Sequence, residues 1–577
     1  TTGEHAISVD GIVHSGGKKT DPENLLDAYL SEQPWFDLPN GACAFIPGRL
    51  SRELDRLSLR GDFRDDDIRF EHWDFSFLAA VFQNKDGKAE RLPGDEVYHA
   101  YISFLNKMQD ATGHPPVLAT LEARLRPYQK IGYAWLTGLI QHGFGGILAD
   151  DMGLGKTIQV LALLLHLKEK GRQSKSMSTT LLIVPKTLIW NWESEIKRFA
   201  PSLSTTIHTG PARDKHFSGC PTSDLVITSY GIVRRDIDAL RRISWDLLIL
   251  DEAQAVKNPD AQISKSVRRL NASNRLALTG TPIENRPLDL WSLFDFLMPG
   301  FLGDKTSFQD TYARQSTDAL NLLGSLTAPF ILRRMKSQVC TELPKKTEIT
   351  QFCGFNEEQR QYYDDLMNRA RDWLTGDNQP IQLLTLLLRL RQAACHPALV
   401  SGADVYRGSS GKFDAMIETA ANILEGGHKI LIFSQFVSLL DLVKQELETR
   451  GMPYYELYGS TRQREKVVQR FKRSDAPCVF LISLKAGGVG LNLTEAGYVF
   501  LLDPWWNPAV ENQAIDRSYR IGQENPVTVY RFITKDSVEE KVNRLKERKR
   551  RVGETVLDHG EFKDTPFSTE ELRMLIS

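Results

Sequence analysis

Short apolar segments alternate with amphipathic helical segments through most of the chain after residue 120. A first set of expected strands comprises 146–148, 180–184, 225–228, 247–250 and 276–279. A second set comprises 429–433, 479–482, 499–502 and 527–532. Strands that alternate with helices indicate βαβ units and mainly parallel sheets. The pattern therefore predicts an α/β fold with two lobes, each a mainly parallel sheet flanked by helices.

A mostly helical stretch separates the two sets of strands, and the pattern is weaker towards both ends of the chain. We expect an N-terminal accessory region at 1–115, whose function is not legible, and a first lobe at 116–300. Helical insertions and a linker at 301–410 are expected to precede a second lobe at 411–536. A C-terminal helix and tail are expected at 537–577. A chain of 577 residues is long enough for several such units.

Composition narrows the choice of class and compartment. The chain has 72 basic and 73 acidic residues, so any track that binds nucleic acid must be local. The six cysteines include no C-x-x-C pair, which argues against a zinc knuckle or a disulfide framework and favours a reducing compartment. No apolar run approaches the roughly eighteen residues of a membrane span, so we expect no membrane partner. Because the chain begins with Thr1, we expect it to be a piece of a longer protein.

The segment 146–157 has the order of a phosphate-binding loop: an apolar strand end, a glycine-rich turn and a helix. This order directs the unpaired N–H groups of the helix and the positive end of its dipole at an anion. Lys156 would reach the outer phosphates of a nucleotide, and Thr157 would hold Mg²⁺. Asp150 replaces the first glycine of the general pattern, and an ordinary strand–helix turn is the alternative. The residues expected to contact the nucleotide here are Asp151, Gly153, Gly155, Lys156 and Thr157.

Two carboxylates, Asp251 and Glu252, follow the apolar strand 247–250. Ligands of α/β sheets collect at the carboxyl ends of strands, so this pair should lie beside the phosphate loop. Asp251 would hold Mg²⁺, and Glu252 would orient and deprotonate the attacking water. A solvated acidic helix start is the alternative. Upstream, the amide of Gln129 offers a donor and an acceptor that match the edge of adenine.

The order of these segments, together with the strand-ending turn at 279–282, resembles helicase superfamily two. The segments 482–493 and 513–523 resemble the fifth and sixth motifs of that superfamily. The sequences DPWWNP at 503–508 and CHP at 395–397 are similar to hallmarks of the Swi/Snf family. The resemblance extends over about 120–555.

The resemblance implies two RecA-like lobes that bind ATP and Mg²⁺ at their interface, in a DNA-dependent ATPase that translocates on double-stranded DNA without separating the strands. It adds Gly490 and Gln513 to the residues that contact ATP. Arg517 and Arg520 of the second lobe would reach the γ-phosphate, unless they form a solvated basic helix face. An arginine supplied across a cleft accelerates hydrolysis by about 10³- to 10⁵-fold. Hydrolysis would therefore require closed lobes, and closure and reopening would drive movement.

DNA contacts are expected from polar groups and backbone amides that follow strand ends on one face of both lobes. In the first lobe they are Lys186, Thr187, Thr228, Ser229 and Tyr230. In the second lobe they are Ser434, Gln435, Gly459, Ser460, Lys485, Gly487, Gly488 and Trp505. At least one of Trp505 and Trp506 is expected to pack structurally instead, as are Cys395 and His396. The basic cluster 546–551 either binds phosphates, braces the lobes or ends a solvated helix.

Two other functions stay open on the sequence alone. The first is a strand-separating helicase of the same superfamily, against which the combination of 251–254 with 503–508 and the helical insertion argues. The second is an ATP-gated remodeler of a protein partner such as RNA polymerase or a nucleosome. In each case we expect a monomeric motor. It would lie in the cytoplasm at the nucleoid of a bacterium, or in the nucleus of a eukaryote.

Overall fold

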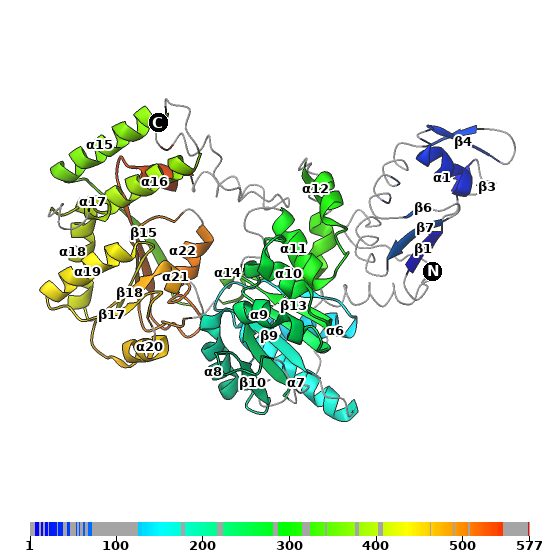
Figure 1. Cartoon of the computed structure of the whole chain (residues 1–577), viewed down its shortest axis with the longest axis horizontal. Coiled ribbons are helices and arrows are strands. Elements are labelled where there is room, and N and C mark those ends of the chain that lie inside the picture. Colours follow the sequence, from blue (N-terminus) through cyan, green and yellow to red (C-terminus); the bar gives the residue numbers. More distant parts are fainter. Residues whose placement is uncertain are drawn as a thin grey trace.

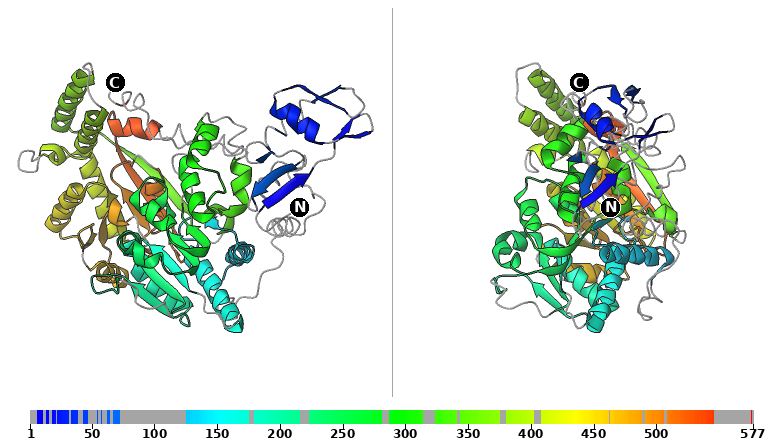
Figure 2. Two further views of the ribbon diagram at one scale, coloured as in Figure 1. Left: turned by 45° about the vertical axis from the view of Figure 1, so that its right-hand side comes forward. Right: turned by 90° about the vertical axis from the view of Figure 1, so that its right-hand side faces the viewer.

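The computed structural model describes residues 125–545 except 175–178, 216–222, 281–286, 314–322, 341–342, 375–379, 402–407, 462, 488–490 and 506–507, together with parts of 6–71 and Leu575. These residues form two α/β lobes. A small N-terminal region lies beyond the first lobe, on the side away from the second (Figures 1 and 2). Within the described residues, no helix is both long enough and apolar enough to cross a membrane.

The first lobe is built on a seven-stranded sheet with the order β10-β11-β9-β12-β13-β8-β14, in which every pair is parallel. Its inner strands are almost wholly buried, as expected when helices cover both faces of a parallel sheet. The strands are β8 (Gly146–Leu148), β9 (Thr180–Val184), β10 (Thr205–His208), β11 (Leu225–Ser229), β12 (Trp245–Asp251), β13 (Ala272–Leu278) and β14 (Ile331–Leu332). The main helices are α6 (Pro127–Gln141), α7 (Lys156–Ser174), α8 (Ile189–Phe199), α9 (Tyr230–Leu240), α10 (Gln262–Arg268), α11 (Pro287–Leu297) and α12 (Lys305–Ala313).

The second lobe is built on a six-stranded parallel sheet with the order β15-β20-β19-β16-β18-β17. The strands are β15 (Lys346–Cys353), β16 (Ile430–Ser434), β17 (Tyr454–Leu457), β18 (Val479–Ser483), β19 (Tyr498–Leu501) and β20 (Val527–Thr534). The helices are α15 (Glu357–Leu374), α16 (Pro380–Cys395), α17 (Ala398–Ser401), α18 (Gly411–Glu425), α19 (Val437–Thr449), α20 (Arg464–Arg473), α21 (Leu484–Gly487) and α22 (Pro508–Ile515). A last helical segment covers 538–545.

The N-terminal region has mixed structure, as the weak sequence pattern predicts. Strands β1 (Ala6–Asp10), β7 (Asp67–Glu71) and β6 (Asp62–Phe63) form an antiparallel sheet. Beside it lie two hairpins and one helix, which are β2 (Val13–Ser15) with β3 (Lys18–Thr20), β4 (Trp35–Asp37) with β5 (Cys43–Phe45), and α1 (Pro22–Leu30).

All nine predicted strands of the two lobes are present, but both lobes extend beyond their predicted limits. β14 pairs with β8, so the first lobe continues past residue 300, and β15 pairs with β20, so the second begins well before residue 411. The predicted boundaries of the helical insertion at 301–410 are therefore wrong at both ends. The strands β10, β15 and β17 were not predicted because they lie at sheet edges and lack a buried apolar run. β14 is too short to give a pattern.

A buried polar network in the second lobe ties its helices to the loop that follows β19. Lys412 Nζ forms an ion pair with Glu539 and donates to the carbonyl oxygen of Leu502 at 3.1 Å. Cys395 Sγ contacts Glu539 Oε1 at 3.1 Å, and Arg391 Nη2 donates to Pro504 O at 2.6 Å. Cys395 thus has a structural role in this network.

Replacing Lys412 with Met should strongly destabilise the second lobe, because it leaves the carboxylate of Glu539 buried without its cation. Loss of one partner of a buried ion pair costs about 3–5 kcal/mol. Lys444→Met is the matched control, since the pair of Lys444 with Glu456 is partly exposed and such pairs contribute at most about 1 kcal/mol. Scanning calorimetry of both variants measures the difference. Equal melting temperatures would show that the network does not hold the lobe together.

Candidate active site at the junction of the lobes

The strands of the first lobe end in register, which brings the predicted catalytic segments to one edge of the sheet. Leu278 of β13 is the partner both of Leu148, which precedes the phosphate loop, and of Asp251, which ends β12. The phosphate loop and the two carboxylates therefore lie side by side, as the sequence predicts. Thr279 follows at the same edge, whereas 281–282 lie outside the described residues.

The phosphate loop has the backbone that its glycines permit. Gly153 and Gly155 have φ of 84° and 79°, a region that is unfavourable for residues with a Cβ atom. A Cβ atom on Gly155 would lie 2.6 Å from Gln129 Nε2. Lys156 begins α7, and its Nζ donates to Asp150 O at 2.5 Å, inside the turn that phosphates would enter.

Asp150, which departs from the general loop pattern, is fully buried and holds an arginine beneath the loop. Arg334 Nε donates to Asp150 Oδ1 at 2.8 Å, and its Nη2 donates to Gln159 Oε1 at 2.8 Å. Arg334 also donates to the carbonyl oxygen of Tyr128. Aspartate in place of the usual glycine thus anchors the base of the phosphate loop through Arg334.

Gln129 lies against the phosphate loop and is almost completely buried. Its Nε2 donates to Leu154 O at 3.0 Å, and its Oε1 accepts from Arg126 N at 3.0 Å. The structure therefore places the amide beside the loop, with both of its functional groups engaged by the protein.

The carboxylate of Asp251 is held by hydrogen bonds from two directions. Trp192 Nε1 donates to Oδ2 at 2.7 Å, and the backbone N–H of Glu252 donates to Oδ1 at 2.9 Å. Burial, and then the neighbouring Glu252, raise the pKa of Asp251 to about 7, although Trp192 and Lys156 act to lower it. A cation at this position would relieve both effects and keep the carboxylate ionised.

Glu252 has a left-handed backbone, with φ of 52°, and is one of two described non-glycine residues with positive φ. Its side chain is fixed by a short relay, because Gln254 Nε2 donates to Glu252 Oε2 at 2.6 Å and Thr279 Oγ1 donates to Gln254 Oε1 at 2.9 Å. The end of β13 is thereby connected to the proposed catalytic carboxylate.

The second lobe brings two arginines against the phosphate loop. Arg517 is 3% exposed, and its Nη2 lies 3.6 Å from Met152 Sδ. Burial lowers the pKa of Arg517 to about 10, while Glu252 acts to raise it, so the side chain remains a cation at neutral pH. Arg520 Cβ lies 2.6 Å from the position of a Cβ atom on Gly153. Gln513 lies in α22, one turn before Arg517, and is half-buried.

A short helix, α14 (Lys336–Val339), connects the lobes directly beside this site. The backbone N–H of Lys336 donates to Asp151 Oδ2 at 2.9 Å in the phosphate loop. Its Nζ contacts Asp516 Oδ1 at 2.5 Å and also donates to the carbonyl oxygen of Tyr519. Lys336 is therefore bonded to both lobes at once.

The DNA candidates of the first lobe divide into exposed and buried groups. Lys186 is exposed and Thr187 is half-buried in the turn after β9. Thr228 and Tyr230 are buried, because β11 is an inner strand and α9 packs beside β9 and β11. Their hydroxyls donate to His208 O at 2.9 Å and to Asp251 O at 2.7 Å. These two side chains, like the buried Ser229, are not presented to DNA here, which corrects the prediction for all three.

The candidates of the second lobe divide in the same way. Gly459 and Ser460 are exposed, and Gln435 is half-buried. Ser434 is fully buried, and its hydroxyl donates to Asp503 Oδ1 at 2.6 Å, so its predicted DNA contact is also corrected. The described residues do not include Gly488, Gly490, Trp506 or 546–551, and of Lys485 and Gly487 only the backbone, within α21, is described.

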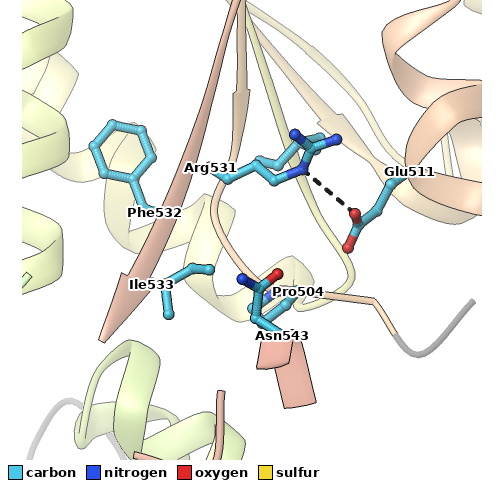
Figure 3. Close-up of a pocket in the computed structure, with 7 residues that line it drawn as sticks. Pro504, Glu511, Arg531, Phe532, Ile533 and Asn543 are labelled. Carbon is cyan, nitrogen blue, oxygen red and sulfur yellow. Dashed lines mark ion pairs between the residues drawn. The ribbon is translucent and has the colours of Figure 1, made fainter. Parts of the chain in front are cut away.

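Trp505 is half-buried and packs against the core of the second lobe, as one of the two tryptophans was expected to do. Its backbone N–H donates to Glu511 Oε1 at 2.7 Å. Figure 3 shows Glu511 facing Arg531 next to a small pocket beside Pro504, with Arg531 Nε 3.6 Å from Glu511 Oε2. All the residues that line this pocket belong to the second lobe or its last helix, so it is not the nucleotide cradle.

Sequence analysis missed the residues that position the catalytic groups. Trp192, Arg334 and Lys336 are far in sequence from their partners and belong to no short motif. One signal was present for Arg334, because a carboxylate at the end of a buried strand, Asp150, requires a cation or donors. The sequence gives no indication of which distant residue provides them.

Comparison with known proteins identifies two family models. The SNF2-related domain matches residues 128–399, and the helicase conserved C-terminal domain matches residues 411–522. A Bacillus subtilis protein with the provisional name ATP-dependent helicase/translocase YwqA is 40% identical, over 82% of this chain and 53% of its own length. The mouse SWI/SNF-related matrix-associated actin-dependent regulator of chromatin subfamily A member 1 is 36% identical, over 78% of this chain and 45% of its own length. The chain thus spans about half the length of these relatives.

Among solved structures, the chain is similar to the SWI2/SNF2 ATPase core of Sulfolobus solfataricus in complex with double-stranded DNA. The sequence identity is 34%, with 80% of this chain and 99% of that chain covered. The TM-score is 0.40, so our description of the fold rests on the strand order given above.

Gly153→Ala should impair ATP hydrolysis far more than it impairs stability. An alanine with φ of 84° is strained by about 1–2 kcal/mol. Its Cβ would also displace Arg520 of the other lobe, and a misplacement of about 1 Å at a catalytic group can cost about 100-fold in rate. Gly427→Ala is the control, because Gly427 has φ of 82° with nothing within 4 Å of an added Cβ. Equal hydrolysis by the two variants would refute a functional approach of Arg520 to the loop.

Proposed function

Since the chain belongs to the SNF2-related family, we propose that it is a DNA-dependent ATPase that translocates along double-stranded DNA without separating the strands. The observation that carries this proposal is the approach of Arg517 and Arg520, on one lobe, to the phosphate loop on the other. An ATPase that completes its active site across two lobes can convert hydrolysis into relative movement of those lobes.

The residues at the junction fit ATP with Mg²⁺. The positive φ angles of Gly153 and Gly155 leave the loop open to phosphate oxygens, and Lys156 already occupies the turn with its ammonium group. Mg²⁺ is usually held by one or two carboxylates together with substrate phosphates, and Asp251 with Thr157 offers such a set. The metal would neutralise charge on the transferred phosphoryl group. Gln129 would contact the adenine, with Asp151, Gly490 and Gln513 as further nucleotide contacts.

Glu252 is the group that would orient and deprotonate the attacking water. Its carboxylate is fixed by Gln254, and its charge acts on Arg517 across the junction. Arg517 and Arg520 would stabilise the charge that develops on the γ-phosphate. Loss of that phosphate removes the anion that holds the arginines against the loop, so the lobes are then free to separate.

Duplex DNA would bind along the strand ends of both lobes, at the candidate residues that are exposed or half-buried. These are Lys186, Thr187, Gln435, Gly459, Ser460 and Trp505. Lys485, Gly487 and Gly488 complete the proposed set. Contacts of this kind go to the phosphate backbone and are independent of base sequence.

A DNA-bound protein is the proposed target of the motor. The mouse relative is named as a regulator of chromatin, and the Bacillus relative as a helicase or translocase. We propose that this chain, as a monomeric motor at the nucleoid or in the nucleus, displaces such a protein, of which a nucleosome and RNA polymerase are examples.

The test of this function is steady-state ATP hydrolysis without nucleic acid and then with duplex DNA, single-stranded DNA and RNA in turn. We expect stimulation by duplex DNA, displacement of a triplex-forming third strand, and no release of a duplex strand. Preference for single strands, or strand release, would identify a helicase instead. Hydrolysis that responds to a protein but to no nucleic acid would identify an ATP-gated protein remodeler.

Glu252→Gln should abolish most hydrolysis and leave ATP binding nearly intact, because the amide cannot accept the proton of water. General base catalysis contributes about 10²- to 10⁴-fold, which sets the expected loss in kcat. Glu446→Gln is the control, because Glu446 is a half-buried carboxylate of α19 that pairs with Arg450 in the second lobe. ATP affinity is measured by equilibrium titration of a fluorescent analogue. A parallel loss of affinity and rate would show that Glu252 acts in binding and not as the base.

A further inference from the structure

Helix α8 lies between the turn after β9 and the catalytic junction. The turn itself, Lys186–Leu188, is a single 3₁₀ turn that continues directly into α8. Lys186 is exposed at its start, whereas Leu188 is anchored in the core of the first lobe. A displacement of the exposed end of this turn would therefore be transmitted to the first turn of α8.

One side of α8 reaches Asp251. Trp192 is 1% exposed, and its indole N–H donates to Asp251 Oδ2 at 2.7 Å. The backbone N–H of Glu252 occupies the other carboxylate oxygen. Since Glu252 lies next to Asp251 in the chain, that bond moves with the carboxylate. Among the described residues, the indole of Trp192 is the donor to this carboxylate that comes from a different element of the fold.

The other side of α8 reaches the second lobe. Trp190 packs against the apolar cluster of that lobe, which includes Leu493 and Ala514. Glu195 follows Trp192 by three residues and so lies near its face of the helix, and the charge of Glu195 acts on Arg520 of the second lobe. A shift of α8 would thus change the contact between the lobes together with the orientation of Asp251.

We propose that Trp192 is a positioning residue for the metal-binding carboxylate Asp251, and that α8 transmits DNA contact at Lys186 and Thr187 to the metal site. This inference rests on the function proposed above and specifies how DNA regulates the same site. DNA bound at the turn fixes α8, and the indole then holds Asp251 Oδ2 in the orientation that a cation requires. Without DNA, α8 is less constrained, and the carboxylate binds the cation more weakly.

The test is Trp192→Phe, which removes the N–H donor and retains a buried aromatic ring. Trp245→Phe is the matched control, because Trp245 is equally buried at the opposite end of β12 and its indole donates to Leu240 O at 3.2 Å. The readout is binding of Mn²⁺ to the protein–ADP complex, followed by electron paramagnetic resonance without turnover. Removal of an outer hydrogen-bond partner of a metal ligand weakens metal binding about 10- to 100-fold, so we expect about 10-fold for Trp192→Phe. No change is expected for Trp245→Phe.

The second arm repeats the titration with duplex DNA. In the unmodified protein, DNA should tighten Mn²⁺ binding, and Trp192→Phe should lose this response. Unchanged Mn²⁺ affinity in Trp192→Phe, or an equal loss in both variants, would overturn the positioning role. If the role holds but DNA tightens binding equally with and without the indole, transmission through α8 is overturned.

Failure of the proposed function gives a different result. In that case DNA does not stimulate hydrolysis by the unmodified protein, yet the Mn²⁺ affinity of Trp192→Phe without DNA still decides the positioning role. If Trp192→Phe does not fold, a tryptophan analogue with sulfur in place of the indole N–H retains the ring shape and supports the same titrations.

Discussion

A buried ion pair, between Asp150 and Arg334, connects the phosphate loop to the segment that links the lobes. Asp150 follows β8 and is fully buried, so its charge requires the arginine that enters just after β14. The same segment continues into Lys336, whose N–H and ammonium group bond to Asp151 and Asp516 respectively. Direct bonds thereby connect the base of the phosphate loop, the linker and the segment of the second lobe that carries Arg517 and Arg520.

The described contacts across the junction combine ion pairs and hydrogen bonds with apolar contacts, which include Ile521 near Leu154 and Trp190 against the apolar cluster of the second lobe. Each of the buried charges at the junction is stabilised by a neighbour of opposite sign, and burial shifts the pKa of both Lys336 and Asp516 towards the neutral form. A bound triphosphate would add anionic charge where Arg517 and Lys156 now face protein atoms.

The sequence was sufficient to predict the inner strands and the proximity of the phosphate loop to Asp251 and Glu252, because buried parallel strands are continuous apolar runs and the loop pattern is local. Edge strands such as β15 were missed, since their side chains are mostly exposed. The start of the second lobe was misplaced for the same reason, whereas the end of the first lobe was misplaced because β14 has only two residues. Tyr230 follows β11 and Ser434 is the last residue of β16, positions from which DNA contacts are expected, yet their hydroxyls turn inward to Asp251 and Asp503. The direction of a side chain at a strand end depends on neighbouring strands, which local sequence does not specify.

This inward turn of strand-end residues bears on how DNA could control hydrolysis. β9 and β11 end beside the edge that we propose faces DNA, and the helices that follow them each send one aromatic residue to Asp251, Trp192 to its carboxylate and Tyr230 to its carbonyl oxygen. Little more than one turn of α8 separates the exposed turn at Lys186 from Trp192, the donor to the proposed metal-binding carboxylate of Asp251. Coupling therefore needs no rearrangement of the sheet. A small rotation of α8 is sufficient, because it moves the indole of Trp192. The carboxylate of Asp251 then loses the hydrogen bond that fixes its orientation from outside its own strand.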